Sequence, residues 1–123
     1  MKPLLLIFFG GGFGSVLRYI IGKWLNTTEN AIPYGTFLVN IVGSLIIGIV
    51  LGYAAKVANT SNTYVFLLAS GFCGGFTTFS AFAYENHLFL RNGDYFSFLI
   101  YALGSIILGL LAVFAGFYFS KVF

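Results

Sequence analysis

Residues 70–82 read SGFCGGFTTFSAF, a stretch without charge that combines a glycine pair with hydroxyl and aromatic side chains. Gly74 and Gly75 each weaken an α-helix by about 1 kcal/mol relative to alanine. The hydroxyl side chains that follow can bond backbone groups released by a break. The stretch therefore predicts either a functional helix break or a tight crossing of two helices, and the residues alone leave both interpretations open.

This stretch belongs to one of four long segments without charge. Because a charged side chain is costly in hydrocarbon, charges indicate where a chain reaches water. Each segment supplies the roughly 20 residues that a helix needs to cross a membrane. We therefore expect an all-α membrane protein with one domain over residues 1–123, and a break at residues 70–82 would leave its third helix broken mid-membrane. Its four transmembrane helices are expected at about residues 3–25, 33–56, 63–90 and 95–120.

The composition agrees with lipid as the solvent. Of the 123 residues, 59% are hydrophobic and 7% are charged, whereas about 25% of a soluble chain is charged. So few acids and bases argue against an enzyme, and the basic residues are too scattered for nucleic-acid binding. Cys73 is the single cysteine, which excludes a disulfide or a cysteine zinc site within one chain.

The basic residues give no preferred orientation in the membrane. Three fall on each side of a four-helix protein: Lys2, Lys56 and Lys121 on one, and Arg18, Lys23 and Arg91 on the other. Because an excess of Lys and Arg in cytoplasmic loops sets orientation, the chain could insert both ways and pair as an antiparallel dimer. A single orientation set by a weak signal is the alternative.

Asn40 lies on a stripe of small and polar residues in the second helix, where small side chains let helices approach closely. An amide in mid-membrane is costly unless it is bonded, so Asn40 either links helices or lines a pathway. Phe79 and Phe82 share one helix face and carry electropositive ring edges. They either pack or face an anion.

Three segments carry a resemblance to a known family. They are GGFGSVLRY at residues 11–19, GTFLVNIVGS at residues 35–44 and GFCGGFTTFSAF at residues 71–82. Together they closely resemble the Fluc fluoride channels, also called CrcB proteins. The resemblance implies a dual-topology, antiparallel homodimer in the bacterial inner (plasma) membrane. Such a dimer would export fluoride passively through two pores, around a structural sodium ion at its centre.

The resemblance also implies roles for individual residues. The matching positions are, for the pore, Asn40, Phe79, Phe82, Ser80, Thr36 and Ser105; for the vestibule and the acid after the Phe motif, Arg18 and Glu85; and, for the carbonyls that hold sodium, Gly74 and Thr77. Position 81 is Ala, where the family usually has Thr, so the chain is expected to lack one hydroxyl of the pore.

The implied mechanism is physically coherent. An isolated anion in a medium of low dielectric constant faces a penalty of tens of kcal/mol, so it needs donors along its path. Conduction also requires sites that the ion can leave, which neutral amides, hydroxyls and ring edges provide. Nothing in the spacing of the residues distinguishes fluoride from another small anion.

Two other functions would suit a small membrane protein with four helices. Small multidrug transporters have a similar size and use a carboxylate in their first helix, but the first acid here is Glu29, in the expected loop. A membrane subunit that only packs against partners would carry glycine stripes without a polar break, and residues 70–82 argue against it.

Overall fold

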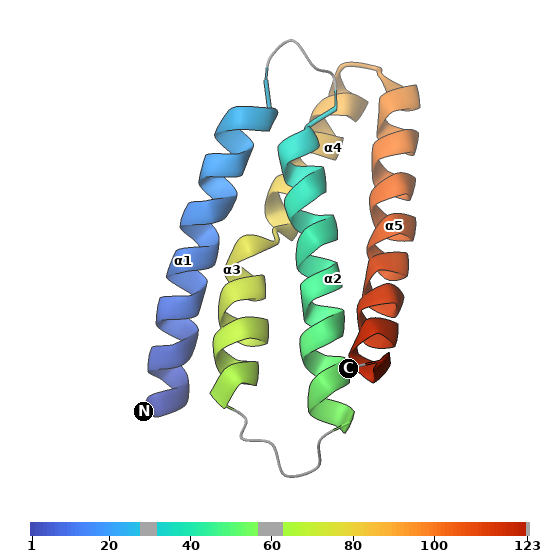
Figure 1. Ribbon diagram of the computed structural model, residues 1–123. Coiled ribbons are helices and arrows are strands. Elements are labelled where there is room, and N and C mark those ends of the chain that lie inside the picture. Colours follow the sequence, from blue (N-terminus) through green and yellow to red (C-terminus); the bar gives the residue numbers. More distant parts are fainter. Residues whose placement is uncertain (28–31, 57–62, 123) are drawn as a thin grey trace.

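Four helical spans run alternately up and down the molecule, and the chain begins at the end where its last helix stops (Figure 1). The computed structural model describes residues 1–27, 32–56 and 63–122, so Glu29 lies outside the described residues. The helices are α1 (Lys2–Leu25), α2 (Tyr34–Lys56), the π-helix η1 (Val65–Cys73), α3 (Gly74–Phe76), α4 (Phe79–Arg91) and α5 (Tyr95–Val122). The third span is η1, α3 and α4 in succession.

All four spans are long and apolar enough to cross a membrane, which confirms the expected number of transmembrane helices. In α5, only 6% of the most apolar window is buried, and in α1 only 11%. Their exposed side chains include Phe9, Phe13, Leu110 and Phe114. Such apolar outer faces are typical of helices surrounded by hydrocarbon.

The third span is interrupted, as one interpretation of residues 70–82 predicts, but the interruption begins at Thr77, two residues after Gly75. Gly74 has helical backbone angles (φ −61°, ψ −37°). The chain becomes extended at Thr77 (φ −85°, ψ 159°) and Thr78 (φ −149°, ψ 120°), and helix α4 starts immediately afterwards. Gly74 and Gly75 are therefore not themselves the point of unwinding.

The glycines instead allow α1 to touch the backbone of the third span. A Cβ atom on Gly10 would collide with the carbonyl oxygen of Leu67, and one on Gly14 with that of Phe72. A Cβ atom on Gly75 would collide with the carbonyl oxygen of Gly11. The tight helix crossing is thus present, and it lies directly before the break.

A second close crossing joins α2 to α5. A Cβ atom on Gly48 would collide with the carbonyl oxygen of Val113, and one on Gly116 with that of Leu45. Because helices in lipid associate through close packing of this kind, these contacts hold α2 between α5 and the third span. They leave a space between the three elements at the level of the break.

The crossing of α1 with α3 gives a prediction about stability. Gly75→Ala is expected to lower the free energy of unfolding by about 2 kcal/mol, because overpacking at a fixed backbone contact has a cost of this size. Gly11→Ala changes the other side of the same contact, where the nearest atom to the new Cβ would be 3.6 Å away. It should be neutral or slightly stabilising, because alanine is the better helix former.

Reversible unfolding of both variants in mixed detergent micelles measures the difference. Equal stabilities of Gly75→Ala and Gly11→Ala would contradict the packing of α1 against α3.

Candidate functional site

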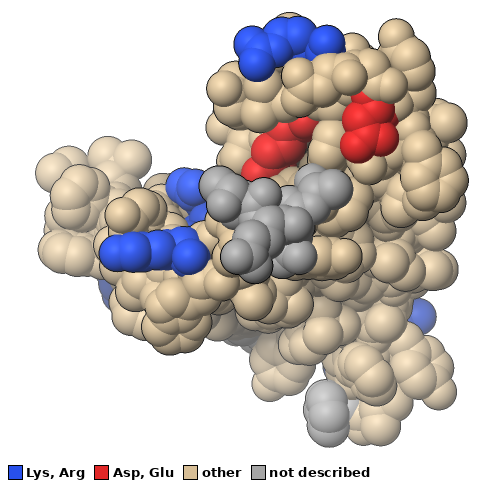
Figure 2. Space-filling model, turned by 90° about the horizontal axis from the view of Figure 1, so that it is seen from above, with Lys and Arg blue, Asp and Glu red and all other residues tan. Residues whose placement is uncertain are grey.

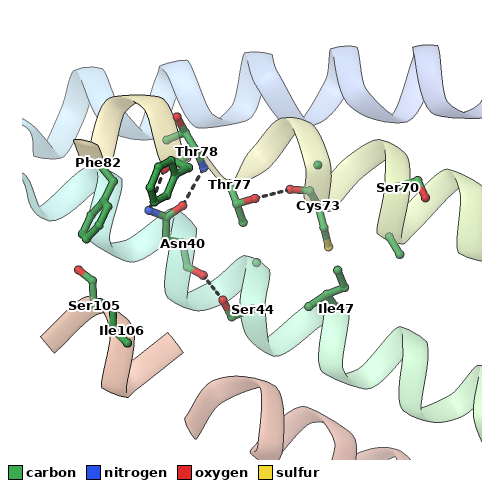
Figure 3. Close-up of a pocket in the computed structure, with 14 residues that line it drawn as sticks. Asn40, Ser44, Ile47, Ser70, Cys73, Thr77, Thr78, Phe82, Ser105 and Ile106 are labelled. Carbon is green, nitrogen blue, oxygen red and sulfur yellow. Dashed lines mark hydrogen bonds between the residues drawn. The ribbon is translucent and has the colours of Figure 1, made fainter. Parts of the chain in front are cut away.

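A hollow of about 480 Å³ lies between α2, the third span and α5 (Figure 3). The described residues that line it are all uncharged: Asn40, Gly43, Ser44, Ile47, Ala69, Ser70, Cys73, Gly74, Thr77, Thr78, Phe79, Phe82, Ser105 and Ile106. The hollow is mostly apolar, with a few amide and hydroxyl groups. It is therefore a membrane-level cavity that offers neutral hydrogen-bonding groups.

Asn40 spans the break in the third span (Figure 3). Its Nδ2 donates to the carbonyl of Thr78 at 3.2 Å, and its Oδ1 accepts from the Thr78 N–H at 2.8 Å. The amide thus supplies the acceptor that the Thr78 N–H lacks at the break, and it adds a side-chain donor to the Thr78 carbonyl. Asn40 therefore links two helices, and it also lines the cavity.

The threonines of the break complete its hydrogen bonding. Thr77 Oγ1 donates to the carbonyl of Cys73 at 2.8 Å. Thr78 is the N-cap of α4, because its Oγ1 accepts from the N–H of Ala81 at 3.2 Å. Ser80 is exposed, and its hydroxyl lies 3.3 Å from that of Thr78. These side chains satisfy groups that the end of one helix and the start of the next leave free.

Backbone carbonyls at the break lose their helical donors, and those of Gly74 and Thr77 are among them. In a continuous α-helix the N–H of residue i+4 bonds the carbonyl of residue i, so Thr78 would serve Gly74 and Ala81 would serve Thr77. Both N–H groups are diverted, to Asn40 Oδ1 and to Thr78 Oγ1. The carbonyls of Gly74 and Thr77 are thereby released from the helix ladder.

Phe79 and Phe82 lie on the rim of the cavity. Their ring centroids are 6.0 Å apart, and the ring of Phe82 lies 5.2 Å from that of Tyr101. Phe79 is 79% exposed, which is far more than packing within this chain would give. The Phe79 ring is therefore accessible from outside the chain.

Ser105 contributes an unpaired hydroxyl. Its Oγ is buried and has no hydrogen-bond partner among the described residues, and the residue lines the cavity. In contrast, the hydroxyl of Ser44 donates to the carbonyl of Asn40 at 2.7 Å. A buried polar atom without a partner is costly, so Ser105 marks a place for a water molecule or a ligand.

A second hollow, of about 360 Å³, lies towards the end of the molecule where α1 stops. Figure 2 looks onto this end, where both basic and acidic side chains are visible. The residues that line this hollow are Arg18, Tyr19, Gly22, Lys23, Asn26, Gly35, Thr36, Thr78, Ala81 and Glu85. Thr78 lines both hollows, so the two spaces adjoin at the break.

Arg18 reaches from α1 to the third span. Its Nε donates to the carbonyl of Gly75 at 3.0 Å, and the Ser15 hydroxyl donates to the same oxygen at 3.4 Å. This carbonyl is also one that the break deprives of a helical donor. Arg18 therefore stabilises the break while it contributes its positive charge to the second hollow.

Glu85 is held by two hydroxyl groups. Thr36 Oγ1 donates to Glu85 Oε2 at 2.7 Å, and the Tyr101 hydroxyl donates to Glu85 Oε1 at 2.7 Å. Thr36 and Tyr101 are both buried. A carboxylate that would repel an approaching anion is thus held against α2 and α5 by two donors.

The structure divides the predicted site residues between the two hollows. The larger one gathers Asn40, Phe79, Phe82, Ser105, Gly74 and Thr77, and the second gathers Thr36, Arg18 and Glu85. Ser80 lines neither. Sequence reasoning missed Tyr101, although its position one turn before Ser105 places both on one helix face.

Comparison with known proteins gives a consistent result. Residues 5–117 match the family described as "CrcB-like protein, Camphor Resistance (CrcB)". The chain is 46% identical to the "Fluoride-specific ion channel FluC" of Gloeothece citriformis, over 98% of each chain. It is 44% identical to the protein of that name from Leptospira interrogans serovar copenhageni, over 99% of this chain and 97% of the relative. Another, from Phocaeicola vulgatus, is 46% identical over 98% of this chain and 100% of the relative.

Proposed function

Because the chain belongs to the CrcB-like protein family, we propose that it is a fluoride channel that lets the ion cross a membrane passively. Its relatives are named as fluoride-specific ion channels, so it is a transport protein and not an enzyme. The observation that carries the proposal is an uncharged cavity at the helix break, lined by an amide, an unpaired hydroxyl and phenylalanine rings.

The two hollows suggest how an anion would travel. Arg18 and Lys23 line the second hollow, which we call the outer hollow. They attract anions from solution, because positive charge in a cleft raises the local anion concentration. Beyond Thr78 the ion would meet the Ser105 hydroxyl and the ring edges of Phe79 and Phe82. These groups are neutral, so they compensate for lost water without trapping the ion.

Fluoride efflux from liposomes that contain the purified chain tests the proposal, with chloride as the comparison. We expect rapid fluoride efflux and little chloride efflux. Vesicles that hold fluoride as tightly as protein-free ones would contradict the function and would favour a subunit that only packs against partners. From its membership of this family we also propose that the protein lies in the bacterial inner membrane.

We further propose that two chains pair antiparallel, with one pore along each side of the pair. Two observations support this arrangement. The basic residues are balanced between the two ends, and Phe79 is exposed at the rim of the cavity. A tag at the C-terminus should be accessible from both faces of the membrane in whole cells and in inverted vesicles. A tag on one face only would contradict the dual orientation.

The released carbonyls of Gly74 and Thr77 fit a structural sodium ion. Unwound backbone carbonyls are the groups that coordinate sodium in membrane transporters, and Gly74 is exposed on the protomer. A second antiparallel chain would add its own pair of carbonyls. The ion would supply positive charge that neutralises these oxygens.

Sodium removal gives a direct prediction. At a hundred times its dissociation constant, a ligand that binds only the folded state adds about 2.7 kcal/mol of stability. The protein should therefore unfold at a higher temperature in sodium chloride than in potassium chloride of equal ionic strength. Identical unfolding temperatures across a sodium titration would contradict the sodium site.

A further inference from the structure

Asn26, the residue that follows α1, makes three hydrogen bonds to the start of α2. Its Oδ1 accepts from the backbone N–H of Gly35 at 2.7 Å and from that of Thr36 at 3.3 Å. Its Nδ2 donates to Thr36 Oγ1 at 3.1 Å. The amide therefore caps α2 and also contacts the side chain that reaches Glu85.

The orientation of this amide follows from the chemistry of its partners. A backbone N–H can only donate, so the side that faces Gly35 and Thr36 must be the oxygen of Asn26. The amide nitrogen is then directed at Thr36 Oγ1 and must donate to it. Because the Thr36 hydroxyl carries one proton and Glu85 as a carboxylate only accepts, that proton is directed to Glu85 Oε2, 2.7 Å away.

We propose that Asn26 is a positioning residue for the anion path: by donating to Thr36, it directs the Thr36 hydroxyl to Glu85 and so holds this carboxylate away from the passing anion. The inference rests on the proposed function. All three residues line the outer hollow together with Arg18 and Lys23. A Glu85 carboxylate that lost its Thr36 donor would be freer to turn into this hollow, where its charge would oppose anion approach.

Asn26→Asp tests this relay, by which we mean the hydrogen bonds from Asn26 to Thr36 and from Thr36 to Glu85. The new carboxylate keeps an oxygen for the α2 N–H groups, but it cannot donate and would accept the Thr36 proton in place of Glu85. Thr27→Asp is the matched control, because it adds the same charge one residue away, at an exposed position that does not line the hollow. Asn26→Ser supplies an uncharged variant whose shorter side chain cannot make both contacts.

The first measurement is infrared spectroscopy of protein made with isotope-labelled glutamate. The sequence contains only two glutamates, Glu29 and Glu85, and a Glu85→Gln sample identifies the band of Glu85. Asn26→Asp should shift this band because Thr36 would donate to the new carboxylate, and Asn26→Ser should shift it because Thr36 Oγ1 would lose the amide N–H that holds it in place. Thr27→Asp should leave it in place, and an unshifted band in both Asn26 variants would overturn the proposal.

The second measurement is fluoride efflux from liposomes at low and high ionic strength. Both Asn26 variants should conduct roughly fivefold more slowly than wild type at either ionic strength, which is the effect expected when one hydrogen bond is lost. Any effect of Thr27→Asp should vanish at high salt. Asn26 variants that conduct like Thr27→Asp would overturn the proposal. A wild type that conducts no fluoride would instead contradict the proposed function, and the Glu85 band would still decide the relay.

Discussion

Asn40→Asp is expected to lower fluoride efflux by about a hundredfold or more. Asn40 donates to the Thr78 carbonyl and accepts from the Thr78 N–H. Aspartate can keep the second bond, but its other oxygen would face the Thr78 carbonyl, so two acceptors would oppose each other. It would also place a negative charge in a cavity whose lining is uncharged. A charge at membrane depth costs about 3 kcal/mol, which corresponds to roughly a hundredfold in rate.

Liposome efflux measures this effect, and elution on gel filtration shows whether the variant still assembles. Asn40→Ala separates charge from hydrogen bonding, because it removes both bonds to Thr78 without adding a charge. We expect Asn40→Ala to conduct more slowly than wild type and faster than Asn40→Asp. Efflux through Asn40→Asp at the wild-type rate would show that Asn40 does not line the anion path.

Phe79→Ile is expected to lower fluoride efflux about tenfold. Isoleucine keeps an apolar side chain on the rim of the cavity, but it lacks the electropositive edge of an aromatic ring. Contacts of ring edges contribute about 0.5–1.5 kcal/mol beyond their buried area, and the upper value corresponds to about tenfold in rate. Phe79 is exposed rather than packed within the chain, so the loss should appear in conduction and not in stability.

Phe114→Ile is the matched control for Phe79→Ile. Phe114 is also a strongly exposed phenylalanine, at 69%, and it lines neither hollow. Its substitution should leave efflux within twofold of wild type. If the two variants conduct alike, the ring of Phe79 has no special role in conduction.

The spans could be predicted from the sequence because they depend on a local property. A charge in hydrocarbon is costly wherever it occurs, so the uncharged segments bounded by charges locate the four helices without knowledge of their packing. The resemblance of three segments then indicated which side chains belong to the site. Asn40 could also be singled out without the resemblance, because it is an amide in an apolar segment, whereas Ser105 was assigned to the pore through the resemblance alone.

The position of the break could not be predicted, because it depends on contacts between distant elements. Gly74 and Gly75 are poor helix formers, yet the packing of α1 keeps them helical. Unwinding begins instead at Thr77, where the amide of Asn40 from α2 is available to bond the released groups. The π-helical hydrogen bonding of η1 has no local signal of this kind either, since the residues of η1 are ordinary apolar and small ones.

The hydrogen bonds that link Asn26 through Thr36 to Glu85 could not be predicted from the sequence either. Asn26 lies ten residues before Thr36, and Glu85 lies 49 residues after it. A lone Asn after a helix is a common end signal. The three side chains meet only because α2 packs beside both the end of α1 and α4 of the third span.

The bonding of Thr78 has a consequence for hydration. The N–H and the carbonyl of Thr78 both bond the Asn40 side chain, at the point where the two hollows adjoin. The Thr78 N–H is therefore not available as a donor to an anion at this point. An anion that passes from one hollow to the other loses hydrogen bonds to water. Side chains, or water molecules that move with the ion, must replace these bonds.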